Sequence, residues 1–314
     1  MVYKGIGDNI MHNINFIYRR NLWYILSLIV IGVGIFFMIS NKINKGSAFN
    51  WGIDFTGGTV LNIRLNDKLA EINSSESQKN KILKEIKTVV VENGHEEVSV
   101  RYIDKSDILM RTRVLSLYGK DKLLKAIEAK FGKIEVLQAD TIGPSVGADL
   151  RTTSIWITLV TLVLLTIYIT FRFEFWFAIS AILALIHDVL ITIGFAAIFR
   201  IEVDTAFVAA ILTILGYSIN DTIVIFDRIR ENLKKHKDDM KLDEIANVSV
   251  NQTLARSINT VMTVLITLAM IILFGGASLQ SFAIVLFVGI FSGCFSSIFV
   301  ASPLMVDFKS RLAK

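Results

Sequence analysis

Six apolar stretches, each long enough to cross a bilayer as a helix, constrain this 314-residue chain more than any other feature. A hydrocarbon layer about 30 Å thick is crossed by about 20 residues of α-helix. Because that layer offers no water to the backbone, each stretch must satisfy its own hydrogen bonds as a helix. The stretches lie at about 22–39, 152–171, 177–199, 206–226, 258–274 and 281–303. The sequence therefore predicts a multi-pass α-helical membrane protein with six transmembrane helices.

Basic residues are concentrated on one side of these stretches. The connection 227–257 contains seven Lys and Arg residues, residues 307–314 contain three, and the N-terminal segment contains Lys4, Arg19 and Arg20. The two short loops on the other side hold one basic residue between them. An excess of Lys and Arg marks the cytoplasmic side, so both termini are expected in the cytoplasm. The first stretch has no small-residue cleavage site after it and is expected to be an uncleaved anchor.

This orientation places a long segment of different composition, residues 41–150, on the periplasmic side. Alternating and helical patterns predict the order β-α-β-β-α-β, which is typical of a ferredoxin-like α+β domain. The expected strands are 57–65, 97–104, 107–115 and 134–140, and the expected helices are 74–93 and 119–132. The first helix is expected to be capped by Ser74 and Ser75 and to bury Ile82, Ile86, Val89 and Val90, and the second to end at Gly132.

The whole organisation follows from these patterns. We expect a cytoplasmic N-terminus and first transmembrane helix (1–40), a periplasmic α+β domain (41–150), a five-helix transmembrane bundle with a cytoplasmic loop at about 227–257 (151–306), and a cytoplasmic tail (307–314).

Glycines and other small residues stand at positions where the backbone must approach something closely. Gly57 and Gly58 in "WGIDFTGGT" lack the lysine of a phosphate-binding loop, and a tight turn into the first strand is the expected role. Gly289, Gly293 and Ser297 recur every four residues, which favours close helix packing.

One carboxylate, Asp221, stands inside the fourth apolar stretch. An ionised side chain in a bilayer costs several kcal/mol, so such residues usually face the bundle interior and commonly serve ion or proton transfer. Tyr217 and Ser218 precede Asp221 by four and three positions and are expected on its face of the helix, with Asn220 beside them. The sequence predicts a proton-carrying role for Asp221, and a purely structural hydrogen-bond network is the alternative.

Three further polar residues are candidates for the same pathway. Arg256, at the start of the fifth stretch, can share the depth of Asp221 and act as its cationic partner. His187 and Asp188 lie in the third stretch, where adjacent positions point about 100° apart, so they are expected to address different neighbours. For these two residues, structural and proton-transfer roles both remain open.

Four motifs together resemble the SecD/SecF family of bacterial protein-export membrane proteins, within the resistance-nodulation-division superfamily. They are "WGIDFTGGT" after the first stretch, "TIGPSVGADL" before the second, "ALIHDVLIT" in the third and "GYSINDTIVIFDRIREN" in the fourth. The resemblance covers nearly the whole chain in the family's order.

The resemblance implies an accessory role in the Sec pathway at the bacterial inner membrane. It implies that SecD, the SecYEG channel and YajC are partners, together with translocating polypeptide and membrane lipid, and that the proton motive force promotes translocation. It also implies that the family's proton pathway falls on Asp221 and Arg256.

Two alternatives remain: half of a proton-driven small-molecule or lipid exporter, or a non-transporting assembly subunit. No enzyme, cofactor, metal site or nucleic-acid partner is expected, since the sequence offers no nucleophile with a base and no ligand cluster.

Overall fold

A computed structural model describes residues 14–65, 76–95, 98–103, 107–236 and 239–312. The chain forms two compact units, one comprising residues 51–155 and the other comprising residues 1–50 together with 156–314. These limits differ by up to ten residues from the expected limits of the α+β domain. The first helix continues to Lys45, and the second begins as early as Pro144. Lys4, the first of the expected basic residues, lies outside the described residues.

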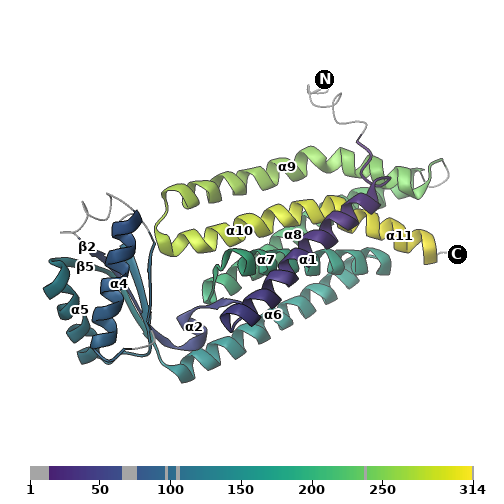
Figure 1. The fold of residues 1–314 in the computed structure, drawn as a ribbon. Helices are drawn as coiled ribbons and strands as arrows, with labels where there is room; N and C mark the ends of the chain where they lie inside the picture. The colour runs from purple at the N-terminus through teal and green to yellow at the C-terminus, as the bar shows by residue number, and fades with distance from the viewer. Residues whose placement is uncertain (1–13, 66–75, 96–97, 104–106, 237–238, 313–314) are drawn as a thin grey trace. The chain divides into compact units, whose positions relative to one another are not determined.

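Within the described ranges, six helices are long and apolar enough to cross a membrane, which agrees with the predicted number (Figure 1). They are α1 (Arg20–Lys45), α6 (Pro144–Arg172), α7 (Phe175–Phe199), α8 (Thr205–His236), α9 (Leu242–Phe274) and a last helix made of α10 (Ala277–Ser296), η2 (Ser297–Ala301) and α11 (Ser302–Leu312). Two-residue strands β1 (Asn50–Trp51) and β6 (Glu202–Val203) follow α1 and α7.

The connection expected as a loop at 227–257 is almost entirely helical. α8 continues to His236, and α9 begins only a few residues later, at Leu242. The side-chain amide of Asn232, which is 5% exposed, donates hydrogen bonds to Ser249 Oγ at 2.8 Å and to Gln252 Oε1 at 2.9 Å. These contacts between helices favour two extended helices over an irregular loop.

The last transmembrane helix contains a short π-helical segment, η2, at Ser297–Ala301. Pro303 follows it and has no backbone amide to donate to the preceding turn, so the regular α-helical ladder is interrupted here. The hydroxyl of Ser302 donates to the Ser297 carbonyl at 2.9 Å. Segments of this kind within α-helices are frequently found at functional sites.

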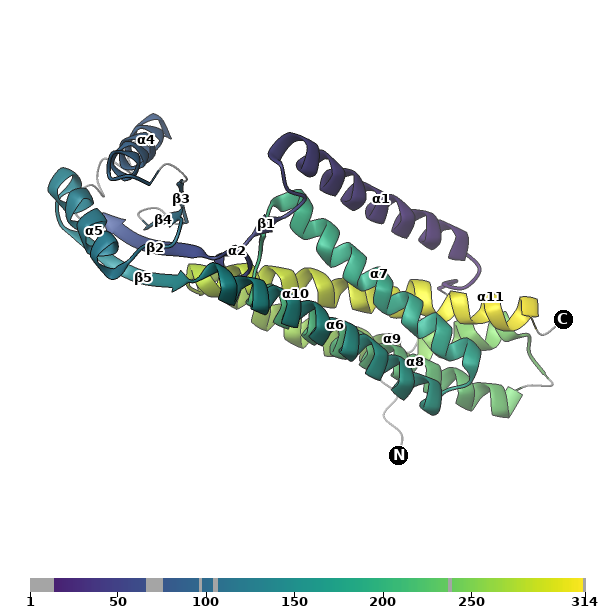
Figure 2. The ribbon, with the colours of Figure 1, turned by 90° about the horizontal axis from the view of Figure 1, so that it is seen from below.

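Small residues allow two pairs of helices to pack closely, and for α10 this is what the four-residue spacing predicts. A Cβ added to Gly289 would overlap the side chain of Ile214, and one added to Gly293 would fall 2.9 Å from Ser218 Cβ and 3.2 Å from Ser218 Cα. α10 therefore lies against α8 with no room for a methyl group, and the prediction of close packing is confirmed. α1 lies beside α7 (Figure 2), and the two helices meet at Gly34 and Gly194.

The other unit is an antiparallel sheet with two helices on one face. Its elements are α2 (Ile53–Thr56), β2 (Gly58–Leu65), α4 (Glu76–Glu92), β3 (Ser99–Tyr102), β4 (Asp107–Thr112), α5 (Leu117–Phe131) and β5 (Ile134–Ile142). The strands lie in the order β3-β4-β2-β5, and each neighbouring pair is antiparallel. This is the ferredoxin-like arrangement expected from the sequence.

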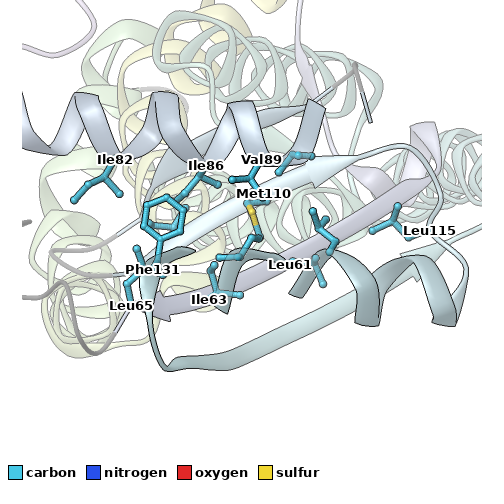
Figure 3. Packing of buried hydrophobic residues seen from close by; sticks show 13 residues of the cluster. Leu61, Ile63, Leu65, Ile82, Ile86, Val89, Met110, Leu115 and Phe131 are labelled. Carbon is cyan, nitrogen blue, oxygen red and sulfur yellow. The ribbon is translucent and has the colours of Figure 1, made fainter. Parts of the chain in front are cut away.

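The core of this unit lies between the sheet and its two helices, as Figure 3 shows. It contains Leu61, Ile63 and Leu65 from β2, Ile82, Ile86, Val89 and Val90 from α4, and Leu123, Ile127 and Phe131 from α5. The predicted buried face of α4 is confirmed. The expected caps Ser74 and Ser75 lie outside the described residues, whereas α5 ends before Gly132 as predicted.

The turn before β2 requires its two glycines. Gly57 and Gly58 have φ values of 70° and 136°, which disfavour residues with a Cβ. A Cβ on Gly57 would lie 2.9 Å from Pro144 Cα, and one on Gly58 would lie 2.8 Å from the Thr112 carbonyl oxygen. The glycine pair therefore brings the start of β2 against the start of α6, which confirms the expected tight turn.

Candidate functional site

Among the described residues of the helical bundle, two carboxylates are buried, Asp188 on α7 and Asp221 on α8. Asp188 is 0% exposed and Asp221 is 8% exposed. A buried carboxylate is costly unless hydrogen bonds or charges compensate it, so the partners of each group indicate what it can do.

Asp188 is surrounded by hydrogen-bond donors on both oxygens. Ser292 Oγ donates to Oδ1 at 2.7 Å, while Ser218 Oγ and Ser296 Oγ donate to Oδ2 at 2.6 and 2.7 Å. His187 Nδ1 lies 3.0 Å from Oδ1. Each oxygen thus has two partners, and the carboxylate joins α7 to α8 and α10.

His187 extends this cluster to α1. Nδ1 of the ring is the atom that lies 3.0 Å from Asp188 Oδ1, and the other ring nitrogen, Nε2, lies 3.1 Å from Ser27 Oγ. The ring also stacks on Phe295. The two side chains were expected to address different neighbours, and they do: His187 reaches Ser27, whereas Asp188 reaches serines of α8 and α10. The contact between His187 and Asp188 themselves was not expected.

Asp221 is only half satisfied. Ser257 Oγ from α9 donates to Oδ1 at 2.5 Å. The other oxygen, Oδ2, is buried and has no hydrogen-bond partner among the residues that the structure describes. This half-satisfied carboxylate contrasts with the fully bonded one on α7.

The expected pairing of Asp221 with Arg256 is not a direct one. Arg256 is exposed on α9 and acts on Asp221 through space as a charged neighbour. No ion pair of 4 Å or less joins the two within the described part of the chain. The position against Asp221 belongs instead to the next residue, Ser257, which points about 100° away from Arg256 around the helix.

The polar stripe expected beside Asp221 divides between two interfaces. Tyr217 Oη donates to the Thr260 carbonyl of α9 at 2.9 Å, on the side of Asp221. Ser218 turns the other way, to Asp188. Asn220 is exposed and belongs to neither cluster, which corrects its expected place in the stripe. Positions three and four residues before Asp221 straddle it, so helix packing assigns them to different neighbours.

Several residues of these clusters were missed by sequence reasoning. They are Ser27, Ser257, Ser292 and Ser296, together with Thr222, whose hydroxyl lies 2.8 Å from that of Ser297 in η2. For Ser297 itself, only a packing role was expected. Serine in an apolar helix looks like a packing residue. The four-residue spacing of Ser292 and Ser296 is the signal that could have identified them.

The donor set does not suit a metal ion. Within the described ranges, no group of three or more His, Cys, Asp and Glu side chains is placed to hold one. Hydroxyls and two separated carboxylates can instead exchange protons and rearrange hydrogen bonds.

The chain is similar to membrane proteins of protein export. Residues 122–311 match the family model "Protein export membrane protein SecD/SecF, C-terminal", and residues 47–67 match the "SecD/SecF GG Motif". The chain is 41% identical to the protein translocase subunit SecF of Sebaldella termitidis, over 91% of this chain and 89% of that protein. It is 38% identical to the SecF of Synechocystis, over 92% of each chain.

Solved structures are similar as well. The crystal structure of SecDF, a translocon-associated membrane protein from Thermus thermophilus, matches 96% of this chain with a TM-score of 0.82 and 34% identity. A SecDF structure in a super-membrane-facing form matches with a TM-score of 0.65. This chain spans only 40% and 39% of those two SecDF chains.

Proposed function

Because this chain belongs to the SecD/SecF family of protein export membrane proteins, we propose that it is an accessory subunit of the Sec export machinery in the bacterial inner membrane. It acts with SecD and uses the proton motive force to promote translocation of secreted proteins. The buried, half-satisfied carboxylate of Asp221 is the observation that supports the proton-driven part of this proposal.

Asp221 has the properties of a proton carrier. Its ionised form leaves a charged oxygen buried without a hydrogen bond, whereas protonation removes the charge and makes that side chain a donor. Neither form is fully satisfied by the surrounding helices as they stand, so a change of protonation favours a change of helix contacts. Ser257 and Arg256 on α9 are the neighbours that respond, one by hydrogen bonding and the other by charge.

The available energy is sufficient for such a switch. One charge crossing 100 mV releases roughly 2.3 kcal/mol, and each unit of pH difference adds about 1.4 kcal/mol. A differential free energy of this size moves a two-state equilibrium by a factor of tens or more. We propose that the proton pathway runs through Asp221, with Arg256 as a charged neighbour that the site residue does not contact directly.

The low burial of two transmembrane helices supports the proposed partners of this subunit. Only 11% of the apolar stretch of α1 and 6% of the apolar stretch of α6 are buried, so these two helices face lipid or another membrane chain. We propose that SecD supplies part of that contact, and that SecYEG, YajC and the translocating polypeptide complete the assembly. We also propose that both termini lie in the cytoplasm and the ferredoxin-like unit in the periplasm, as the distribution of Lys and Arg predicts.

The test compares Asp221→Asn with Asn220→Ala in the full chain expressed with its own SecD. Export of a secreted reporter from spheroplasts is measured with and without an imposed proton gradient. We expect D221N to lose the gradient-dependent part of export and still co-purify with SecD, and N220A, altered at the exposed neighbouring position, to behave as wild type. Gradient-dependent export that persists in D221N would instead favour the assembly-subunit alternative.

A further inference from the structure

We infer that Asp188 is a positioning residue for the proton-carrying site: it holds α8 against α7 and α10 so that Asp221 faces α9. This inference rests on the proposed function of Asp221 and adds a separate role for the neighbouring buried carboxylate. Asp188 does not touch Asp221 directly and acts on it through Ser218.

Asp188 is suited to joining helices and not to transferring a proton. All four of its hydrogen-bond positions are occupied, by three serine hydroxyls and His187. If Asp188 took up a proton, one of these donors would have to rotate and accept a hydrogen bond from the new carboxyl O–H. The bonds come from α7, α8 and α10, and His187 adds α1 through Ser27, so one carboxylate ties four helices together.

The link to Asp221 runs along one turn of α8. Ser218 stands three residues before Asp221, about 4.5 Å along the axis and on the adjoining side of the helix. A second bond, between Thr222 and Ser297, fixes the same side of α8. The absence of side chains at Gly289 and Gly293 lets α10 reach these positions. Because these bonds hold one side of α8, the Asp221 side chain on the adjoining side is directed toward α9.

The opposite side of α8 is held less firmly near Asp221. There the hydroxyl of Ser257 contacts one carboxylate oxygen, and Tyr217 reaches a backbone carbonyl of α9. The other oxygen of Asp221 has no hydrogen-bond partner among the described residues. A rearrangement driven by a proton at Asp221 is therefore expected at the seam between α8 and α9, while α8 stays fixed to α7 and α10.

The charged and titratable groups around Asp188 are few. Among the described residues, α7 contributes His187, α8 contributes Asp221 one turn beyond Ser218, and α10 contributes the thiol of Cys294, which lies in sequence between Ser292 and Ser296. From α1 the contacting group is the uncharged Ser27. Because Asp221 is on α8, a shift of this helix would change the surroundings of the Asp221 carboxylate. The change would then appear in the pH dependence of export.

The experiment compares two variants that each remove one hydroxyl donated to Asp188. Ser218→Ala cuts the bond to α8, and Ser292→Ala cuts a bond to α10 only. Export from spheroplasts is measured against external pH at a fixed membrane potential, with the full chain and its own SecD. We expect S218A to shift the midpoint of the pH profile by about half a pH unit or more, the size of one lost hydrogen bond. S292A is expected to leave the midpoint in place.

A merely structural role for Asp188 would lower export in both variants equally without moving either midpoint, and this result would overturn the inference. Ser218→Cys retains the size of serine with a weaker donor, so it gives a smaller shift even if S218A assembles poorly. D221N separates the two claims. A pH dependence that survives in D221N refutes the proposed function, whereas a flat profile there with an unshifted S218A refutes only the positioning role.

Discussion

The contact between Gly293 and Ser218 allows a quantitative test of how closely α8 and α10 must pack. In Gly293→Ala the new methyl carbon would lie 2.9 Å from Ser218 Cβ and 3.2 Å from both its Cα and Oγ. Ordinary carbon contacts begin near 3.5 Å, so α8 must move away by about 0.5 Å. That displacement falls on the residue whose hydroxyl bonds Asp188 at 2.6 Å.

Overpacking of this kind costs about 1–3 kcal/mol. The matched control is Gly216→Ala in α8, where an added Cβ meets nothing within 4 Å. Replacing a mid-helix glycine without a clash stabilises a helix by up to about 1 kcal/mol. Both variants add one methyl group, but only the methyl group of G293A meets a neighbouring helix. The two variants should therefore change stability in opposite directions.

The assay is thermal unfolding of the purified full chain in detergent, scanned at one rate for wild type and both variants. We expect G293A to unfold at a lower temperature than wild type and G216A at the same or a higher temperature. If G293A unfolded together with G216A, the close approach of α8 and α10 would not constrain the bundle, and the argument from the glycine spacing would fail.

Two further predictions concern the ferredoxin-like unit. Gly57→Ala should lower its stability, because a φ of 70° with a ψ of 165° is adopted almost only by glycine and costs other residues about 1–3 kcal/mol, and because the methyl group would meet Pro144 at 2.9 Å. Limited proteolysis of the full chain measures the change, and wild-type resistance would contradict it. Burial raises the pKa of Tyr102 from its ordinary value of 10.0 to about 12. Its folded-state pKa is the higher one, so its contribution to stability is complete below pH 10 and is lost as pH rises to about 12. Tyr102→Phe should remove this part of the alkaline loss in unfolding scans, and an unchanged slope between these pH values would refute the assignment.

Much of the architecture could be predicted from local pattern. The length of each apolar stretch decides that it crosses a bilayer, and the periods of 2 and 3.6 decide which segments of the other unit are strands and helices. The burial of Ile82 and Ile86 and the glycine turn at Gly57 and Gly58 follow from the same local rules. The cost of a carboxylate in hydrocarbon likewise identified Asp221 without any knowledge of its neighbours.

Tertiary structure alone decided which groups these residues meet. Periodicity places Ser218 and Tyr217 beside Asp221, but only the packing of α8 sends one to Asp188 and the other to α9. In the same way, it is the rotation of α9 that sets Ser257 against Asp221 and leaves Arg256 exposed. Hydrogen bonds between helices depend on the rotation and axial position of both partners. These quantities are set by contacts between distant segments, and no local pattern in a single stretch contains them.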